Sequence, residues 1–163
     1  MAKAEEKTNV MRILDAKKIK YISYEYDNSR AMPGEEIAKT LGKDPATVFK
    51  TLVTVGKSGN HYVFDVPVLC ELDLKKAAAA VGEKSIEMIK QAELLPLTGY
   101  IHGGCSPIGM KKFFRTTFHS TAEKLDTVCF SAGKIGRQVE MSPEELMKVI
   151  RFGYADIVKE NLM

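Results

Sequence analysis

A glycine-rich segment in the second half of the chain holds the residues best suited to chemistry. It begins with Gly103 and Gly104, continues through Pro107 and Gly109, and is followed after Met110 by two lysines. Glycine adopts backbone conformations that other residues avoid and lets a ligand approach the main chain, while proline fixes the direction of the exit. The segment is predicted to present backbone N–H groups to a carbonyl oxygen, a carboxylate or a phosphate. A plain loop with the same composition is the alternative.

Cysteine and histidine show no spacing typical of a metal site or a disulfide framework. The three cysteines are far apart and form no C-x-x-C pair, and the three histidines have no ligand spacing: Cys70, Cys105 and Cys129; His61, His102 and His119. We expect reduced thiols, no bound metal and no cofactor. A hydrolase with Cys105 as the nucleophile would need a base within reach. His102 is the only local candidate, and three residues of extended loop give poor geometry for that contact.

Length and composition indicate one globular domain. The 163 residues are 45% hydrophobic and 28% charged, which predicts a single domain over residues 1–163 with its own core. No apolar run approaches the roughly 20 residues that span a bilayer, and four of the first seven residues are charged, so we expect a cytoplasmic protein without a membrane partner.

The charge balance is mildly basic. The formal net charge is +3, which does not by itself identify a nucleic-acid-binding protein. Several cations lie in or beside turn-rich segments, where they would either converge on a phosphate backbone or form an ordinary solvated surface: Lys50, Lys57, Lys111, Lys112, Arg115, Lys134 and Arg137.

The elements that must position these residues alternate between helix and strand, which predicts a mixed α/β domain. In the first half, we expect a helix capped by Thr8, a strand over residues 21–26, and a helix from Pro33 that Gly42 ends. A β-hairpin is predicted from residues 51–55 and 61–67, which are rich in β-branched and aromatic side chains.

The second half is predicted in the same way. Helices are expected over residues 73–81 and 85–94, followed by strands over 113–118, 127–131 and 137–141. Ser142 and Glu145 form a capping box for a helix over residues 146–152 that Gly153 ends, and the remaining residues are expected to form an extra turn or a frayed tail.

Four motifs in this order resemble one known family. They are residues 49–53, FKTLV; residues 103–109, GGCSPIG; residues 131–139, SAGKIGRQV; and residues 142–146, SPEEL. Together they are similar to the YbaK family of aminoacyl-tRNA deacylases, which is related to the editing domain of bacterial prolyl-tRNA synthetases. The likeness covers nearly the whole chain. It implies a compact domain with a largely antiparallel, barrel-like mixed sheet flanked by helices, and a site in a cleft beside the sheet.

The resemblance also assigns expected roles. Lys50 matches the essential lysine of the family, Gly103, Gly104, Ser106 and Pro107 match its G-x-x-x-P loop, and Ser131 matches a serine that lines the cleft. Contacts to the substrate are expected from a first-strand tyrosine, either Tyr24 or Tyr26, and from Cys105 and Gly133. Cys105 takes no catalytic role in this interpretation.

The implied activity is the removal of cysteine from Cys-tRNA(Pro). The thiol of the bound cysteinyl group attacks its own ester carbonyl, and the amides of residues 103–106 donate to the oxyanion that forms. The implied partner is the 3′ acceptor end of an aminoacyl-tRNA, with prolyl-tRNA synthetase as a docking partner in some members. Three alternatives stay open: a deacylase for another small amino acid, a binding module without catalysis, and the Cys105 hydrolase.

Overall fold

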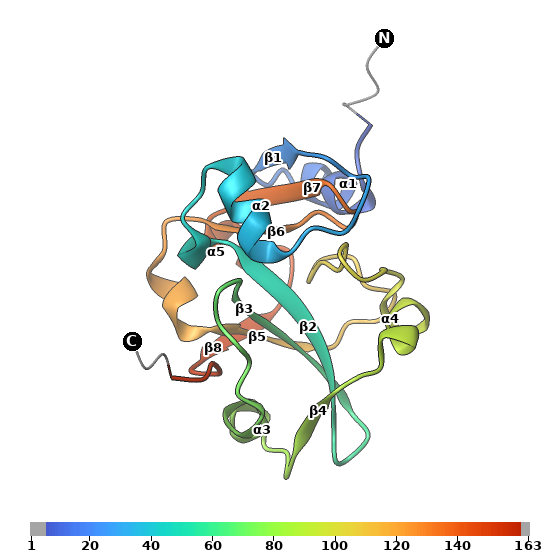
Figure 1. The fold of residues 1–163 in the computed structure, drawn as a ribbon, viewed down its shortest axis with the longest axis vertical. Coiled ribbons are helices and arrows are strands. Elements are labelled where there is room, and N and C mark those ends of the chain that lie inside the picture. Colours follow the sequence, from blue (N-terminus) through green and yellow to red (C-terminus); the bar gives the residue numbers. More distant parts are fainter. Residues whose placement is uncertain (1–5, 161–163) are drawn as a thin grey trace.

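The computed structural model describes residues 6–160, which form two β-sheets with helices around them (Figure 1). The smaller sheet has the order β1-β7-β6, from β1 (Ile22–Glu25), β7 (Arg137–Met141) and β6 (Val128–Ser131), and is antiparallel throughout. The larger sheet has the order β4-β2-β3-β5-β8. Its strands are β4 (Ile86–Met88), β2 (Phe49–Gly56), β3 (His61–Pro67), β5 (Arg115–His119) and β8 (Phe152–Ala155).

Antiparallel pairing predominates, as expected for this mixed fold. Strands β4, β2 and β3 are antiparallel neighbours, whereas β3, β5 and β8 run parallel. The described strands do not close into one barrel. Instead, the two sheets meet at an isolated parallel bridge between Val48 and Cys129.

Local signals place the helices. Thr8 caps α1 (Asn9–Ala16) by accepting from the amide of Met11, Asp73 caps α3 (Leu74–Val81), and Ser142 caps α5 (Pro143–Met147). Helix α2 (Gly34–Leu41) ends at Gly42, which is left-handed with φ 67°. A 3₁₀ turn, η1 (Pro45–Thr47), leads directly into β2. The helices capped by Thr8 and Asp73 and the helix that ends at Gly42 confirm the predictions for these elements.

Two predicted helices are wrong. Residues 86–88 form β4, because they pair with residues 54–56 of β2, and the helix begins later as α4 (Gln91–Thr98) with Pro96 inside it. The helix after Ser142 is short, and the segment expected to continue it and then fray forms β8, the parallel neighbour of β5. In both places a long-range strand pairing overrides a local helix pattern.

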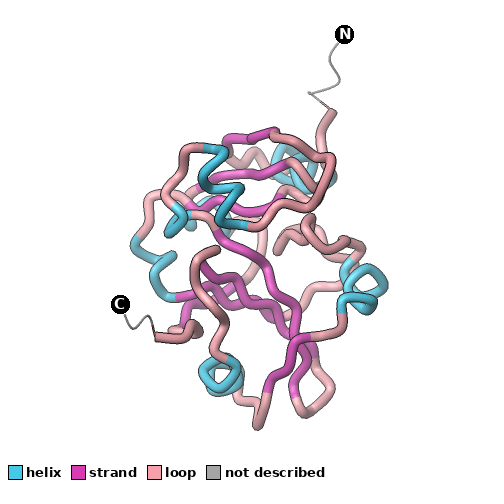
Figure 2. Tube along the Cα trace, viewed as in Figure 1, coloured by secondary structure: helices cyan, strands magenta, loops and turns pink. Residues whose placement is uncertain are grey.

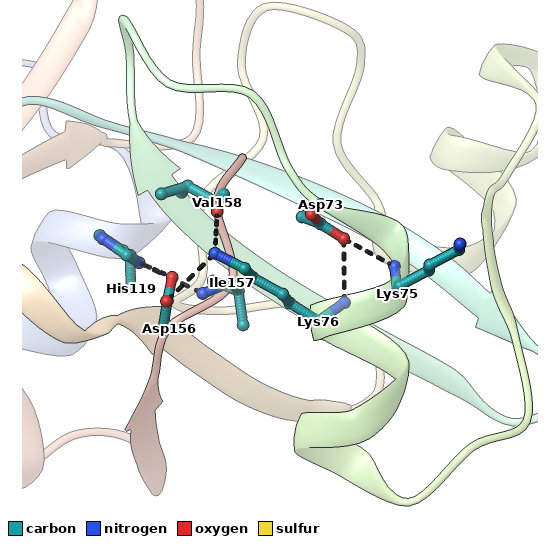
Figure 3. Close-up of polar contacts among 7 residues, drawn as sticks. All are labelled: Asp73, Lys75, Lys76, His119, Asp156, Ile157 and Val158. Carbon is teal, nitrogen blue, oxygen red and sulfur yellow. Dashed lines mark hydrogen bonds and ion pairs between the residues drawn. The ribbon is translucent and has the colours of Figure 1, made fainter. Parts of the chain in front are cut away.

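The chain after β8 is held against α3 rather than frayed (Figure 3). Lys76 donates to the Asp156 carboxylate at 3.1 Å and to the carbonyl of Val158 at 2.9 Å. The amide of Ile157 donates to Nδ1 of His119 at 3.3 Å, and burial lowers the pKa of this imidazole. A neutral imidazole suits the contact, because Nδ1 must accept. The last three residues of the predicted tail lie outside the described part.

Two large apolar clusters lie on either side of the main sheet. One joins Leu14 of α1 to Phe118 of β5 and Phe130 of β6, all fully buried, and the other packs α3 against Phe64. A long segment without helix or strand, residues 99–114, connects α4 to β5 (Figure 2). Within residues 6–160, every helix is too short or too polar to cross a bilayer.

Candidate functional site

The candidate site lies where strand β2 changes its partners. One side of β2 pairs with β3 along almost its whole length. Its other side meets the smaller sheet at the bridge of Val48 and meets β4 only from Thr54 onward. Between these contacts, within the described residues 6–160, the edge of residues 50–52 has no strand partner. A cavity of about 400 Å³ opens at this gap.

Segments that are distant in the sequence line the cavity. They are the chain before α2 and the first turns of α2, the edge of β2, the glycine-rich segment, and the ends of β6 and β7. The polar and loop residues among the lining are Lys50, Thr51, His102, Gly103, Cys105, Ser131 and Gln138. The apolar part includes Met32, Ile37, Phe49, Leu52, Val68 and Leu94.

Lys50 reaches the cavity from β2 and is half-buried. Among residues 6–160, its ammonium group has no carboxylate within ion-pairing distance. A lysine without a protein counter-charge at a cavity is a ready contact for an anionic group of a ligand.

The glycine-rich segment contributes only part of what the sequence predicts. Gly103 lines the cavity with φ 91°, and Cys105 lines it two residues later. The amide of Gly104 donates to the carbonyl of Ile101 at 3.0 Å, so this donor is engaged within the loop. Ser106 is fully buried and its hydroxyl accepts from the amide of Ile108 at 3.3 Å. Gly104, Ser106 and Pro107 thus lie behind the cavity surface.

Ser131 lies at the end of β6 and lines the cavity, as expected. Its hydroxyl accepts from the amide of Gly133 at 3.1 Å, which fixes the start of the turn to β7. Gly133, predicted to contact the substrate, instead lines a second cavity of about 280 Å³ beside Tyr100.

The two candidate tyrosines lie outside the lining, in different surroundings. Tyr24 donates to Glu140 at 2.5 Å, and Lys43 pairs with the same carboxylate at 2.9 Å. The bond to Glu140 raises the pKa of Tyr24. The hydroxyl of Tyr26 accepts from the side-chain amide of Gln138 at 3.3 Å. Tyr26 is therefore linked to the cavity through Gln138, which is a lining residue.

Gln138 is a lining residue that sequence reasoning missed. It stands opposite Ser131 in the β6–β7 register, and its side chain is 4% exposed. Its carbonyl oxygen accepts from the thiol of Cys129 at 3.5 Å, while its amide nitrogen donates to Tyr26. Both ends of the amide are fixed. Its place opposite Ser131 follows from the β6–β7 register, which no local sequence pattern records.

Asp65 is the second residue that sequence reasoning missed. It is fully buried on β3 behind Thr51, whose hydroxyl donates to Oδ1 at 2.5 Å, and Oδ2 has no hydrogen-bond partner among residues 6–160. Burial raises the pKa of Asp65 to about 8. Nothing in the local sequence indicates that Asp65 lies behind the cavity, because this position follows from the register of β2 and β3.

Cys105 is a neutral thiol in this environment. Burial, with a smaller effect from the charge of Asp65, raises its pKa to about 12. A nucleophilic cysteine needs the opposite shift, since the thiolate is the reactive form. The raised pKa agrees with the prediction that Cys105 takes no catalytic role.

The basic side chains do not gather at the main cavity. Lys111 and Lys134 line the second cavity, Arg115 donates to the carbonyls of Ala80 and Val81, and Lys57 lies in the distant β2–β3 turn. Only Lys50 of the basic set lines the main cavity. Residues 6–160 also contain no group of three or more His, Cys, Asp or Glu that could hold a metal ion.

Comparison with known proteins gives the site a context. A family model described as "Aminoacyl-tRNA editing domain" matches residues 29–149. A protein of Enterococcus faecalis (strain ATCC 700802 / V583), named "Putative Cys-tRNA(Pro)/Cys-tRNA(Cys) deacylase EbsC", is 42% identical over 156 residues, which are 95% of this chain and 95% of that protein.

Solved structures share the fold. One, described as "Crystal structure of a putative trans-editing enzyme for prolyl tRNA synthetase", has a TM-score of 0.79 at 24% identity and covers 94% of this chain and 99% of its own. Another, described as hypothetical protein APE2540, has a TM-score of 0.83 at 20% identity, covering 93% and 100%. The family model spans the residues from the wall before α2 to α5, and the resemblance seen in the sequence is confirmed. The chain belongs to the aminoacyl-tRNA editing domain family.

Proposed function

We propose that this chain is a trans-editing deacylase that removes cysteine from mischarged Cys-tRNA(Pro), with residues 1–163 acting as one deacylase domain. The observation that carries the proposal is the meeting of Lys50, Gly103 and Ser131 at one cavity. These residues come from three of the motifs that resemble the deacylases. The relative in Enterococcus faecalis, whose name gives cysteinyl-tRNA as substrate, supports the choice of amino acid.

The proposed reaction uses the substrate's own side chain. The cysteinyl sulfur attacks its ester carbonyl, the bond from that carbon to the ribose oxygen breaks, and the tRNA leaves with a free hydroxyl group. The resulting thiolactone then reacts with water. A bound substrate that carries its nucleophile needs positioning more than it needs an enzyme nucleophile, in accord with the neutral thiol of Cys105.

Each lining residue takes a role that suits its chemistry. Lys50 holds the terminal ribose or phosphate as a compact positive charge. The Gly103 segment turns its backbone toward the ester, where an amide donor stabilises the oxyanion. Ser131 and the fixed amide of Gln138 supply further polar contacts in the cavity.

The test is a panel of aminoacyl-tRNAs with the purified protein, followed by loss of the ester bond. Cys-tRNA(Pro) should lose its amino acid at least tenfold faster than Pro-tRNA(Pro) and Ala-tRNA(Pro), because neither proline nor alanine carries a side-chain nucleophile, and proximity effects of this kind exceed about tenfold. Equal rates on the three would exclude substrate assistance. Binding without turnover would favour a non-catalytic binding module.

Cys-tRNA(Cys) is a second candidate substrate, because the relative's name includes it. If the cavity encloses only the aminoacyl group, the protein by itself selects for cysteine and does not distinguish between the two tRNAs. Adding prolyl-tRNA synthetase to the assay tests the partner directly. If the synthetase supplies the tRNA selectivity, it will raise the rate on Cys-tRNA(Pro) and leave the rate on Cys-tRNA(Cys) unchanged. We place this activity in the cytoplasm, where tRNA is aminoacylated.

A further inference from the structure

Thr51 and Asp65 stand opposite one another in the antiparallel register of β2 and β3. Opposed residues of paired strands point to the same face of the sheet, so their side chains meet. The Thr51 hydroxyl donates to Oδ1 of Asp65 at 2.5 Å. Thr51 is half-buried and lines the cavity, whereas Asp65 is fully buried behind it.

The hydrogen bond fixes what Thr51 offers to a ligand. A threonine hydroxyl has one proton and two lone pairs, and its proton is directed at Asp65. The oxygen of Thr51 is left as a hydrogen-bond acceptor. A ligand group that donates a proton, such as a thiol, matches an acceptor at this position.

The surroundings of Asp65 favour its protonated form. Val63 on the same strand and Phe118 opposite it on β5 are both fully buried. Cys105, from the glycine-rich segment, is the titratable group that interacts with Asp65, and within residues 6–160 no cation pairs with the carboxylate. Burial brings the pKa of Asp65 to about 8. This value is close to the ordinary thiol pKa of about 8.5, and proton transfer is most efficient between groups of matched pKa.

We propose that Thr51 and Asp65 form a proton-accepting pair for the thiol of the bound cysteinyl group. This inference rests on the proposed function. The pair acts in the ionised form of Asp65, whose fraction grows as the pH approaches the pKa of about 8. The thiol proton then passes to Oγ1 of Thr51 while the Thr51 proton passes to the Asp65 carboxylate, and the sulfur forms its bond to the ester carbon. When the carbon–oxygen bond to ribose breaks, the same proton returns through Thr51 to the ribose oxygen. Asp65 is ionised again, and the tRNA and the thiolactone are the products.

In this arrangement Asp65 is a positioning residue, because it acts through Thr51. Single-turnover deacylation of Cys-tRNA(Pro) between pH 6 and pH 9 tests the pair, with Asp65→Asn, Thr51→Val and Thr51→Ser. The first two variants should lower the single-turnover rate constant by about 10²-fold or more, the usual range for removal of general-base assistance, with little change in KM. Thr51→Ser keeps the hydroxyl and should keep the rate. Glu87→Gln, an exposed carboxylate on β4, is the matched control.

A second measurement needs no substrate. The carboxyl carbon of Asp65 is followed by NMR as a function of pH. Because the Thr51 hydrogen bond lowers the pKa of Asp65, Thr51→Val should raise it and Thr51→Ser should leave it in place. An unchanged pKa in Thr51→Val would overturn the pair, even if Asp65→Asn fails to fold.

The outcomes separate the two proposals. If the wild-type protein releases no cysteine at any pH, the proposed function fails and the relay fails with it. If the wild type is active and Thr51→Val keeps its rate and pH profile, only the relay is overturned. If Thr51→Val is slow at every pH and Thr51→Ser is not, the relay is supported.

Discussion

Gly103 and Ala31 approach each other so closely that a Cβ atom on residue 103 would lie 2.8 Å from the Cβ of Ala31. Gly103 also has φ 91°, a conformation that residues with a side chain rarely adopt. Gly103→Ala should therefore displace the segment from the wall before α2. If this segment supplies the oxyanion donor, kcat should fall about 10²-fold or more.

Gly59→Ala is the control for that substitution. Gly59 has φ 94° in the β2–β3 turn, with open space around the position of an added Cβ. It therefore carries the same backbone strain without the contact at the cavity. Full activity in Gly59→Ala and loss in Gly103→Ala, with circular dichroism spectra alike, is the expected pattern. An unaffected Gly103→Ala would mean that the segment is only a turn.

Lys50→Ala should abolish most of the activity and leave the fold intact. The side chain is half-buried and has no ion-pair partner in the described chain, so its loss should change the free energy of unfolding little. Lys57→Ala, on an exposed turn of the same hairpin, is the matched variant. Rates on Cys-tRNA(Pro) and urea unfolding are measured for both, and a Lys50→Ala protein as active as its parent would remove this lysine from the site.

Cys105→Ala should keep a substantial part of the activity. The thiol is neutral because its pKa is raised to about 12, and a packed cysteine behaves as a small apolar group. Mass spectrometry of the quenched reaction should detect no cysteinyl group bound to the wild-type protein. A trapped acyl-enzyme together with an inactive Cys105→Ala would instead establish a thiol hydrolase.

The free energy of unfolding should depend on the charge of Asp65. Its pKa is about 8 in the folded protein, well above the ordinary value of about 3.9, so between these limits the folded state binds a proton that the unfolded state has lost. The stability from this group is present at low pH and is lost as pH rises through about 8. The loss is roughly 1.4 kcal/mol for each pH unit inside that window.

Asp65→Asn isolates this contribution. The amide does not titrate, so the difference in unfolding free energy between wild type and variant, measured in urea from pH 5 to pH 9, should change in favour of the variant as pH rises. Protonation of His119 acts on both proteins alike and cancels in the difference. A difference that stays constant with pH would contradict a buried neutral carboxyl group.

Local sequence signals were sufficient for much of the fold. The caps at Thr8, Gly42 and Ser142 and the turn of residues 56–60 each depend on a few neighbouring residues, and each lies where the sequence predicts it. Strands β4 and β8 were not predictable in this way. Both form because they pair with a strand that is distant in the sequence, and the residues near them do not indicate this pairing.

The site divides in a similar manner. Lys50, Gly103, Cys105 and Ser131 belong to motifs that can be read along the chain, and all four line the cavity. Residues such as Gln138 and Asp65 take their places from strand register, so a sequence pattern does not single them out. The choice between Tyr24 and Tyr26 also depends on their side-chain partners, which follow from the three-dimensional structure.

The gap beside residues 50–52 has a mechanical consequence. Because the two sheets are joined by the Val48–Cys129 bridge beside the cavity, a change in the angle between the sheets should change the width of the cavity. Lys43, which follows α2, pairs with Glu140 of β7 at 2.9 Å and adds a second tie to the smaller sheet. The size of aminoacyl group that the protein admits should therefore depend on how rigidly the Val48–Cys129 bridge holds the two sheets, as well as on the side chains that line the cavity.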